Sequence, residues 1–158
     1  MNAAKTGKKI CVLMVDVSAT AFAKTCADLE QLDASGFDLS HCNSASAAYD
    51  YLRLHRVDVV LLDLPSLEGD GREVFHRFKN AFPDLAVILF TSITDDAFAL
   101  EVLQSGAQDC LVKAHVNGPL LSRSIRYAVQ RKQFEEMIRE REETHRTLLE
   151  SMPDIVYK

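Results

Sequence analysis

Acidic, hydroxyl and basic side chains follow short apolar segments of this 158-residue chain. Asp16 and Asp63 follow the first and third segments, Thr91 with Ser92 the fourth, and Lys113 the fifth. Two carboxylates, a hydroxyl and an ammonium group in one crevice could hold a phosphoryl group. One carboxylate would attack phosphorus, the ammonium group would offset charge, and the hydroxyl would donate to a phosphoryl oxygen. This chemistry requires the ends of four segments to meet.

The apolar segments are predicted to be strands, at residues 10–15, 37–41, 57–62, 86–90 and 109–112, with helical periodicity between them. VDVVLLD and LAVILFT are nearly continuous apolar runs, which is typical of strands covered by helices on both faces. We therefore predict an α/β fold of the (βα)5, flavodoxin-like type, with a doubly wound five-stranded parallel sheet. In such a sheet, ligands bind outside the carboxyl ends of the strands, so the polar residues are expected to converge there.

Helix signals agree with this arrangement. Ser18 can cap a first helix that stops near Gly36, and Ser44 can cap a second. Thr94 and the two aspartates after it are expected to open the fourth helix, and Asn117 the fifth.

The fifth helix is expected to continue well beyond the domain. Residues 120–150 contain no Gly or Pro and are rich in helix-forming residues, so the helix could run some 45 Å. The seven-residue spacing of Tyr127, Phe134, Arg141 and Leu148 indicates a dimer seam, although Arg141 is a poor seam residue. A solvated single helix is the alternative to a parallel dimer.

Four motifs in order resemble those of response-regulator receiver domains of two-component signalling. They are VLMVD at 12–16, DVVLLDLPSLEGDG at 58–71, VILFTS at 87–92 and GAQDCLVK at 106–113. The resemblance covers residues 10 to about 130. The closing RTLLESMPDIVYK is similar to the opening of a PAS domain, which suggests the amino-terminal part of a longer receiver–PAS protein. We accordingly expect a disordered tail at 1–9, the receiver domain at 10–122, a signalling helix or coiled coil at 123–150 and a truncated PAS start at 151–158.

The resemblance implies a role for each strand-end residue. Asp63 would accept a phosphoryl group from a histidine kinase or phosphotransfer protein, and Lys113 would pair with Asp63 and the phosphoryl oxygens. Thr91 would be the hydroxyl that moves toward the phosphoryl group. Asp16, Asp63 and the backbone carbonyl of Pro65 would ligate Mg²⁺.

Four positions depart from the receiver pattern: Val17, Cys110, Ala114 and Leu67, of which the first two bear on the chemistry and the signal. Receivers usually carry two adjacent acids after the first strand, but here the pair is Asp16 and Val17. Valine has no oxygen to offer Mg²⁺, so weak or absent metal binding is expected unless water or Asp16 fills the position. Cys110 stands where relatives commonly have Tyr or Phe. In those relatives the ring swings inward as the hydroxyl corresponding to Thr91 moves, and a thiol is too small to make the same movement visible at the surface. A phosphorylation-independent pseudo-receiver, used for docking or dimerisation, is therefore the alternative function.

Charge, motifs and composition narrow the other options. The net charge is −5, and the sequence shows no concentrated basic face of the kind that nucleic-acid binding requires. The apolar run after the polar start is too short for a membrane span, so a cytoplasmic protein is expected. The four cysteines are expected to be buried small hydrophobes rather than disulfide or zinc partners, because they form no CxxC pair and each lies in an apolar stretch. The chain is expected to be a phosphoacceptor rather than an enzyme, since no P-loop, GxSxG, HExxH or dinucleotide motif occurs. His41 and His145 are expected to be packed or solvated rather than ligands.

Overall fold

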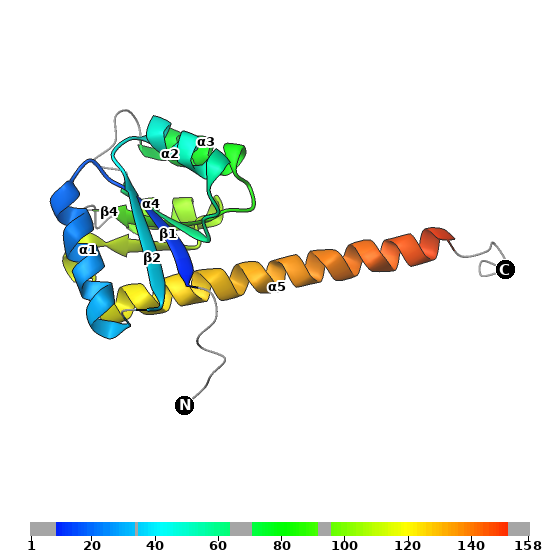
Figure 1. The fold of residues 1–158 in the computed structure, drawn as a ribbon. Helices are drawn as coiled ribbons and strands as arrows, with labels where there is room; N and C mark the ends of the chain where they lie inside the picture. Colours follow the sequence, from blue (N-terminus) through cyan, green and yellow to red (C-terminus); the bar gives the residue numbers. More distant parts are fainter. Residues whose placement is uncertain (1–8, 34, 64–70, 92–95, 152–158) are drawn as a thin grey trace.

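Five parallel strands form one sheet in the order β2-β1-β3-β4-β5 (Figure 1). The computed structural model describes residues 9–33, 35–63, 71–91 and 96–151. The strands are β1 (Ile10–Val15), β2 (Phe37–Cys42), β3 (Val59–Asp63), β4 (Ala86–Thr91) and β5 (Asp109–Val112). The helices are α1 (Ala19–Leu32), α2 (Ala45–Leu54), α3 (Gly71–Ala81), α4 (Asp96–Gln104) and α5 (Gly118–Ser151), and a 3-10 turn, η2 (Lys113–His115), follows β5.

The predicted fold class is confirmed, and two buried layers explain it. One core cluster lies under α2, α3 and α4 and includes Phe75, Phe78 and Val102. The other lies under α1 and α5 and includes Leu29 and Ile125. Because both faces of the sheet are covered, every residue of β3 and β4 is buried, as their continuous apolar sequences indicate.

The sheet order reverses between β1 and β3, which is where the site lies. Chain connections from β1 run to β2 on one side, and those from β3 run to β4 and β5 on the other. Val15 pairs with Leu62, so the residues that follow them reach the same level at the carboxyl edge. This edge is the ligand-binding position of a doubly wound sheet.

Side-chain caps begin three helices at the predicted residues. Ser18 Oγ accepts a hydrogen bond from Ala21 N at 3.1 Å, and Ser44 Oγ accepts one from Ala47 N at 3.1 Å. Asn117 Oδ1 accepts one from Leu120 N at 2.8 Å. Each cap satisfies a backbone N–H that the first helical turn leaves without a carbonyl partner. The predicted cap at Thr94 lies outside the described residues.

Some predicted boundaries were wrong by a few residues. The first helix ends at Leu32 rather than near Gly36, because Asp33 leaves the helical conformation with φ −156° and ψ 91°. The second strand continues to Cys42, which pairs with Val15, and the third begins at Val59 rather than Val57.

Helix α5 is continuous for 34 residues and projects from the body of the domain (Figure 1). At about 1.5 Å per residue it is roughly 50 Å long. Its first part packs on α1 and β4, whereas residues 133–150 are all exposed. Ser124 Oγ donates to Asp109 Oδ2 at 2.9 Å and ties the packed part to β5. None of the described helices combines the length and apolar composition that crossing a bilayer requires.

Candidate functional site

Two carboxylates lie side by side at the carboxyl edge of the sheet. Asp63 is the last residue of β3, and Asp16 follows β1 directly. They are 0% and 1% exposed, respectively. An ionised carboxylate that is removed from water needs a cation or hydrogen-bond donors to compensate for the lost hydration. The pair is therefore a place where positive charge is required.

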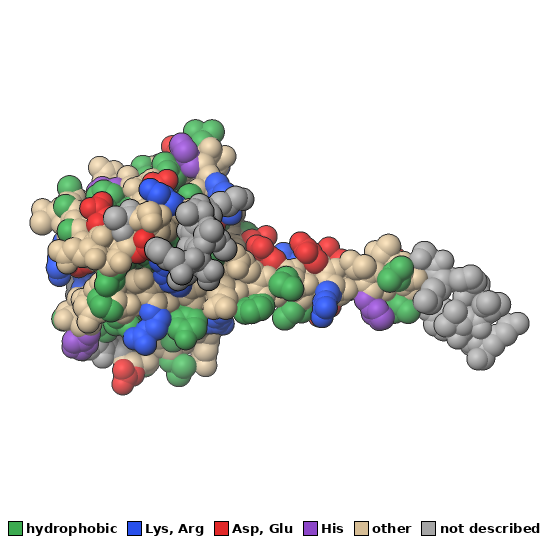
Figure 2. Space-filling model, turned by 60° about the horizontal axis from the view of Figure 1, so that its bottom comes forward, with side chains coloured by type: hydrophobic (Ala, Val, Ile, Leu, Met, Phe, Trp, Pro, Cys, Tyr) green, Lys and Arg blue, Asp and Glu red, His purple; other side chains and the backbone are tan. Residues whose placement is uncertain are grey.

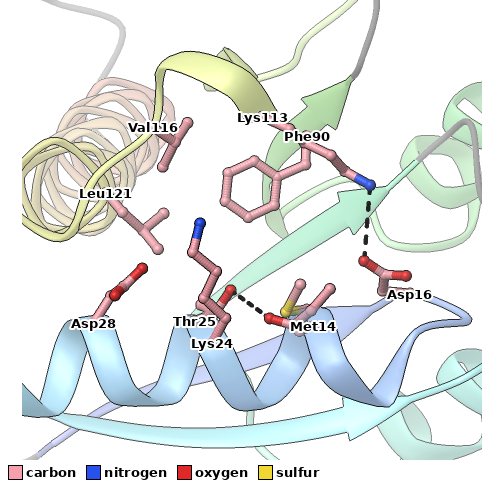
Figure 3. Close-up of a pocket in the computed structure, with 10 residues that line it drawn as sticks. Met14, Asp16, Lys24, Thr25, Asp28, Phe90, Lys113, Val116 and Leu121 are labelled. Atoms are coloured by element: carbon pink, nitrogen blue, oxygen red, sulfur yellow. Dashed lines mark hydrogen bonds and ion pairs between the residues drawn. The ribbon is translucent and has the colours of Figure 1, made fainter.

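Lys113 supplies part of that positive charge. Its ammonium group donates a hydrogen bond to Asp63 Oδ2, and its Nζ lies 4.0 Å from Asp16 Oδ2. Figure 3 shows the lysine side chain reaching from η2 toward Asp16. The lysine side chain is 36% exposed, so the ammonium group keeps contact with solvent.

Burial raises the pKa of the Asp63 carboxyl, and the neighbouring Asp16 raises it further, while the hydrogen bond from Lys113 lowers it. Burial is the largest of these influences, so the carboxyl is harder to ionise than in water. One ammonium group does not balance two buried carboxylates. A bound cation would favour the ionised form that a nucleophile needs.

Thr91 lies at the same edge, at the end of the neighbouring strand. Asp63 pairs with Phe90, which places the threonine one residue further along β4. Thr91 pairs in turn with Val112 of β5, the residue before Lys113. The threonine is 1% exposed. Strand register thus brings the predicted acid, hydroxyl and amine residues to one edge of the sheet.

Hard-cation binding is compatible with the two carboxylates. Asp16 Oδ1 accepts a hydrogen bond from Ser18 N at 2.8 Å, but its buried Oδ2 accepts none from the described residues. A buried carboxylate oxygen that accepts no hydrogen bond is a suitable ligand for a hard cation such as Mg²⁺. The described residues contain no group of three or more His, Cys, Asp or Glu side chains that could hold a metal ion. Pro65, the predicted carbonyl ligand, lies outside the described residues.

Val17 and Cys110, two of the departures from the receiver pattern, have defined surroundings. Val17 follows Asp16 and is 55% exposed. Cys110 is half-buried and packs against the core cluster under α2, α3 and α4. Burial raises the pKa of its thiol, so the thiol stays protonated at neutral pH. All four cysteines, each within the described part of the chain, are free, but only Cys42 is buried as predicted, and the other three are partly buried.

A pocket of about 120 Å³ lies between α1 and α5, beside the Asp16 carboxylate (Figure 3). Asp16 and Lys113 line it together with apolar side chains that include Met14, Phe90 and Leu121. The pocket brings open space up to Asp16 and Lys113, and Lys24 and Asp28 of α1 also line it.

The sequence prediction overlooked the contact made by His41. It expected a packed or solvated ring, and the ring is indeed half-buried and stacked on Phe22, with centroids 4.8 Å apart. However, His41 Nε2 also lies 2.6 Å from the backbone oxygen of Asp16. Parallel pairing of Met14 with His41 could have indicated this proximity.

Comparison with known proteins agrees with this geometry. Residues 12–125 match the family model of the response regulator receiver domain. The regulatory protein LuxO of Vibrio vulnificus is 34% identical over 79 residues, which are 49% of this chain and 17% of that protein. The transcriptional regulatory protein ZraR of Klebsiella oxytoca is 29% identical over 109 residues, or 68% of this chain and 24% of that protein. The chain thus spans less than a quarter of the length of these two relatives.

Solved structures show the same fold. The CheY-like receiver domain from Methanospirillum hungatei has a TM-score of 0.69 at 19% identity, covering 81% of this chain and 99% of that one. The signal receiver domain of a DNA-binding response regulator from Colwellia psychrerythraea has a TM-score of 0.66 at 26% identity, covering 77% and 99%.

Proposed function

The chain belongs to the response regulator receiver domain family, and on this premise we propose that Asp63 accepts a phosphoryl group from the phosphohistidine of a histidine kinase or phosphotransfer protein. The observation that carries the proposal is the buried Asp63 carboxylate in contact with the Lys113 ammonium group and beside Asp16. Its other motivation is the position of Thr91 at the same sheet edge.

In the proposed transfer, a carboxylate oxygen of Asp63 forms a bond to phosphorus as the phosphorus–nitrogen bond of the phosphohistidine breaks. The bonding electron pair stays on the imidazole nitrogen, and the product on the receiver is an acyl phosphate. Lys113 would then pair with the phosphoryl oxygens, because its ammonium group already lies at the carboxylate. Thr91 would donate its hydroxyl proton to one of those oxygens. The chain itself acts as the acceptor rather than as a catalyst for other substrates.

Receiver domains generally bind Mg²⁺ at their acidic pocket. In this chain Asp16 and Asp63 would hold the ion, with the Pro65 carbonyl as a further ligand. When bound, the ion neutralises charge on the phosphoryl oxygens during transfer. Since Val17 offers no oxygen, we propose that Mg²⁺ binds more weakly here than in receivers with two adjacent acids.

The projecting part of α5 supports a second element of the proposal, a parallel homodimer. Exposed apolar side chains gather along one face of this helix (Figure 2), and Tyr127, Phe134, Met137, Ile138 and Leu148 are each 55–60% exposed. A second copy of the same helix would bury this apolar face. Arg139 Nη2 lies 3.2 Å from Asp84 Oδ1 on the opposite side, which directs that side toward the body of the domain.

The proposed organisation is a receiver domain at 10–122 and a signalling helix at 123–150. The helix would pass the state of the receiver to a downstream module, which we place in the cytoplasm with the partner kinase. The predicted tail at 1–9 and PAS start at 151–158 fall almost wholly outside the described residues.

Acetyl phosphate with Mg²⁺ tests the phosphoacceptor role, followed by intact-protein mass spectrometry. We expect one phosphoryl adduct on the wild type, none on Asp63→Asn and a normal adduct on Asp50→Asn. Asp50 is a matched control because its side chain is 74% exposed on α2. If the wild type gains no adduct over a range of Mg²⁺ concentrations, the phosphoacceptor proposal is wrong and the pseudo-receiver alternative is favoured. That alternative is motivated by Val17 and Cys110.

Light scattering after size-exclusion chromatography tests the dimer. We expect the wild type to be dimeric and Phe134→Glu with Ile138→Glu to be monomeric, because charges would enter the apolar seam. Glu143→Lys is the control, since it lies nine residues beyond Phe134, roughly two and a half turns away, on the opposite face. A monomeric wild type would refute the proposed seam.

A further inference from the structure

We propose that His41 is a positioning residue for the metal and phosphoryl site, acting by holding the backbone of Asp16. This inference rests on the proposed function, because it concerns the carboxylates that would bind the cation. His41 lies in β2 at the edge of the sheet and is not part of the acid, hydroxyl and amine set.

The ring is held in one orientation by two contacts. It stacks on Phe22 of α1 with an interplanar angle of 12°. Its Nε2 lies 2.6 Å from the carbonyl oxygen of Asp16. A carbonyl oxygen has no proton to give, so Nε2–H is the donor in this hydrogen bond. The histidine thus connects the edge strand, the first helix and the loop between β1 and α1.

Asp16 depends on such contacts because regular strand pairing stops at this residue. Its N–H donates to Cys42 O at 3.0 Å, and its Oδ1 accepts from Ser18 N at 2.8 Å. The hydrogen bond from His41 holds the carbonyl at the other side of the residue. Together these contacts fix the peptide planes on both sides of Asp16 and leave Oδ2 as the oxygen beside Lys113.

The valine at position 17 makes the hydrogen bond from His41 to the Asp16 carbonyl more important. Val17 is exposed and cannot ligate a cation, so no adjacent carboxylate can compensate if Asp16 turns away. With only two carboxylates among the described residues at this edge, the angle of each should govern cation affinity. A hydrogen bond of ordinary strength corresponds to roughly a threefold to tenfold change in an equilibrium constant.

Titration with Mn²⁺, followed by the electron paramagnetic resonance signal of the free ion, tests the inference without requiring phosphorylation. We expect His41→Phe to weaken Mn²⁺ binding by roughly threefold to tenfold, because it keeps the ring stack but removes the donor. His41→Gln, whose amide nitrogen can replace Nε2, should bind within about twofold of the wild type.

His55→Phe is the matched control and should leave the affinity unchanged. His55 also stacks on a ring, that of Tyr51, and its Nδ1 lies 3.1 Å from Tyr51 O, but it lies at the end of α2. The inference is overturned if the wild type binds no Mn²⁺, if His41→Phe binds as tightly as the wild type, or if His41→Gln binds as weakly as His41→Phe.

The acetyl phosphate assay distinguishes this inference from the proposed function. If Asp63 is phosphorylated but His41→Phe and His41→Gln bind Mn²⁺ with the same affinity as each other, the role of His41 is rejected. The phosphoacceptor proposal then still stands. Mn²⁺ binding that depends on His41, without any phosphoryl adduct, would support the positioning role and reject phosphorylation.

Discussion

Replacing Asp63 with asparagine should stabilise the protein at neutral pH. The carboxylate is fully buried beside Asp16, and its pKa is raised chiefly by burial. A pKa that is higher in the folded state than in the unfolded chain means that ionisation at neutral pH reduces the free energy of unfolding. Asparagine has nearly the same shape and carries no charge, so it removes this cost. Lys113 loses its partner, but its side chain is 36% exposed and can be solvated.

The magnitude follows from the cost of keeping a charged pair out of water. Replacing a buried ion pair by neutral side chains is often stabilising by about 1–4 kcal/mol. Because the Lys113 side chain stays partly solvated, we expect Asp63→Asn to raise the free energy of unfolding by about 1–3 kcal/mol at pH 7.5, or roughly 3–5 °C in Tm for each kcal/mol. The wild type recovers this stability as the pH falls through the raised folded-state pKa. The difference in unfolding free energy between Asp63→Asn and the wild type should therefore shrink over this pH range. It should vanish below the unfolded-chain pKa of about 3.9.

Urea unfolding followed by circular dichroism, in the presence of a chelator, measures this effect between pH 7.5 and 3.5. Asp50→Asn is the control, and it should change stability by less than about 0.5 kcal/mol because Asp50 is exposed. Our account of the site electrostatics is refuted if Asp63→Asn is less stable than the wild type at pH 7.5. A gain that does not change between the two ends of the pH range would refute it as well.

Three further changes test the packing around the site. Lys113→Met should lower the free energy of unfolding at pH 7.5 by about 1–3 kcal/mol in urea titrations, since the buried Asp63 carboxylate loses its cationic partner. Gly118→Ala should cost about 1–3 kcal/mol by the same measurement, because an added Cβ would lie 2.9 Å from the backbone oxygen of Asp28 in α1. Asn117→Ala should lower Tm by several degrees in calorimetry, because it removes the cap of α5, worth about 1 kcal/mol. If the stability of any of these variants is unchanged, the stabilising role that we assign to the corresponding contact is refuted.

The local part of the fold could be predicted from the sequence because its signals are local. β3 and β4 consist of aliphatic runs long enough for a strand and too short for most helices, so their type was clear. The caps at Ser18 and Ser44 were also predictable, because a serine hydroxyl before a helical segment satisfies free N–H groups close to it in the chain. Strand ends were less certain, since Cys42 joins β2 only through pairing with Val15 of a different segment.

The residue types at the strand ends are local properties of the chain, and the parallel topology then placed Asp16, Asp63, Thr91 and Lys113 at one edge. Which of these side chains meet depends on the folded packing: the Lys113 ammonium group contacts Asp63, and a buried oxygen of Asp16 accepts no hydrogen bond from the described residues. The same packing also brings His41 to the carbonyl of Asp16, across 25 residues of chain. Contacts of this kind depend on strand register and on the packing of α1 over the sheet, and neither is encoded in the spacing of the residues that form them.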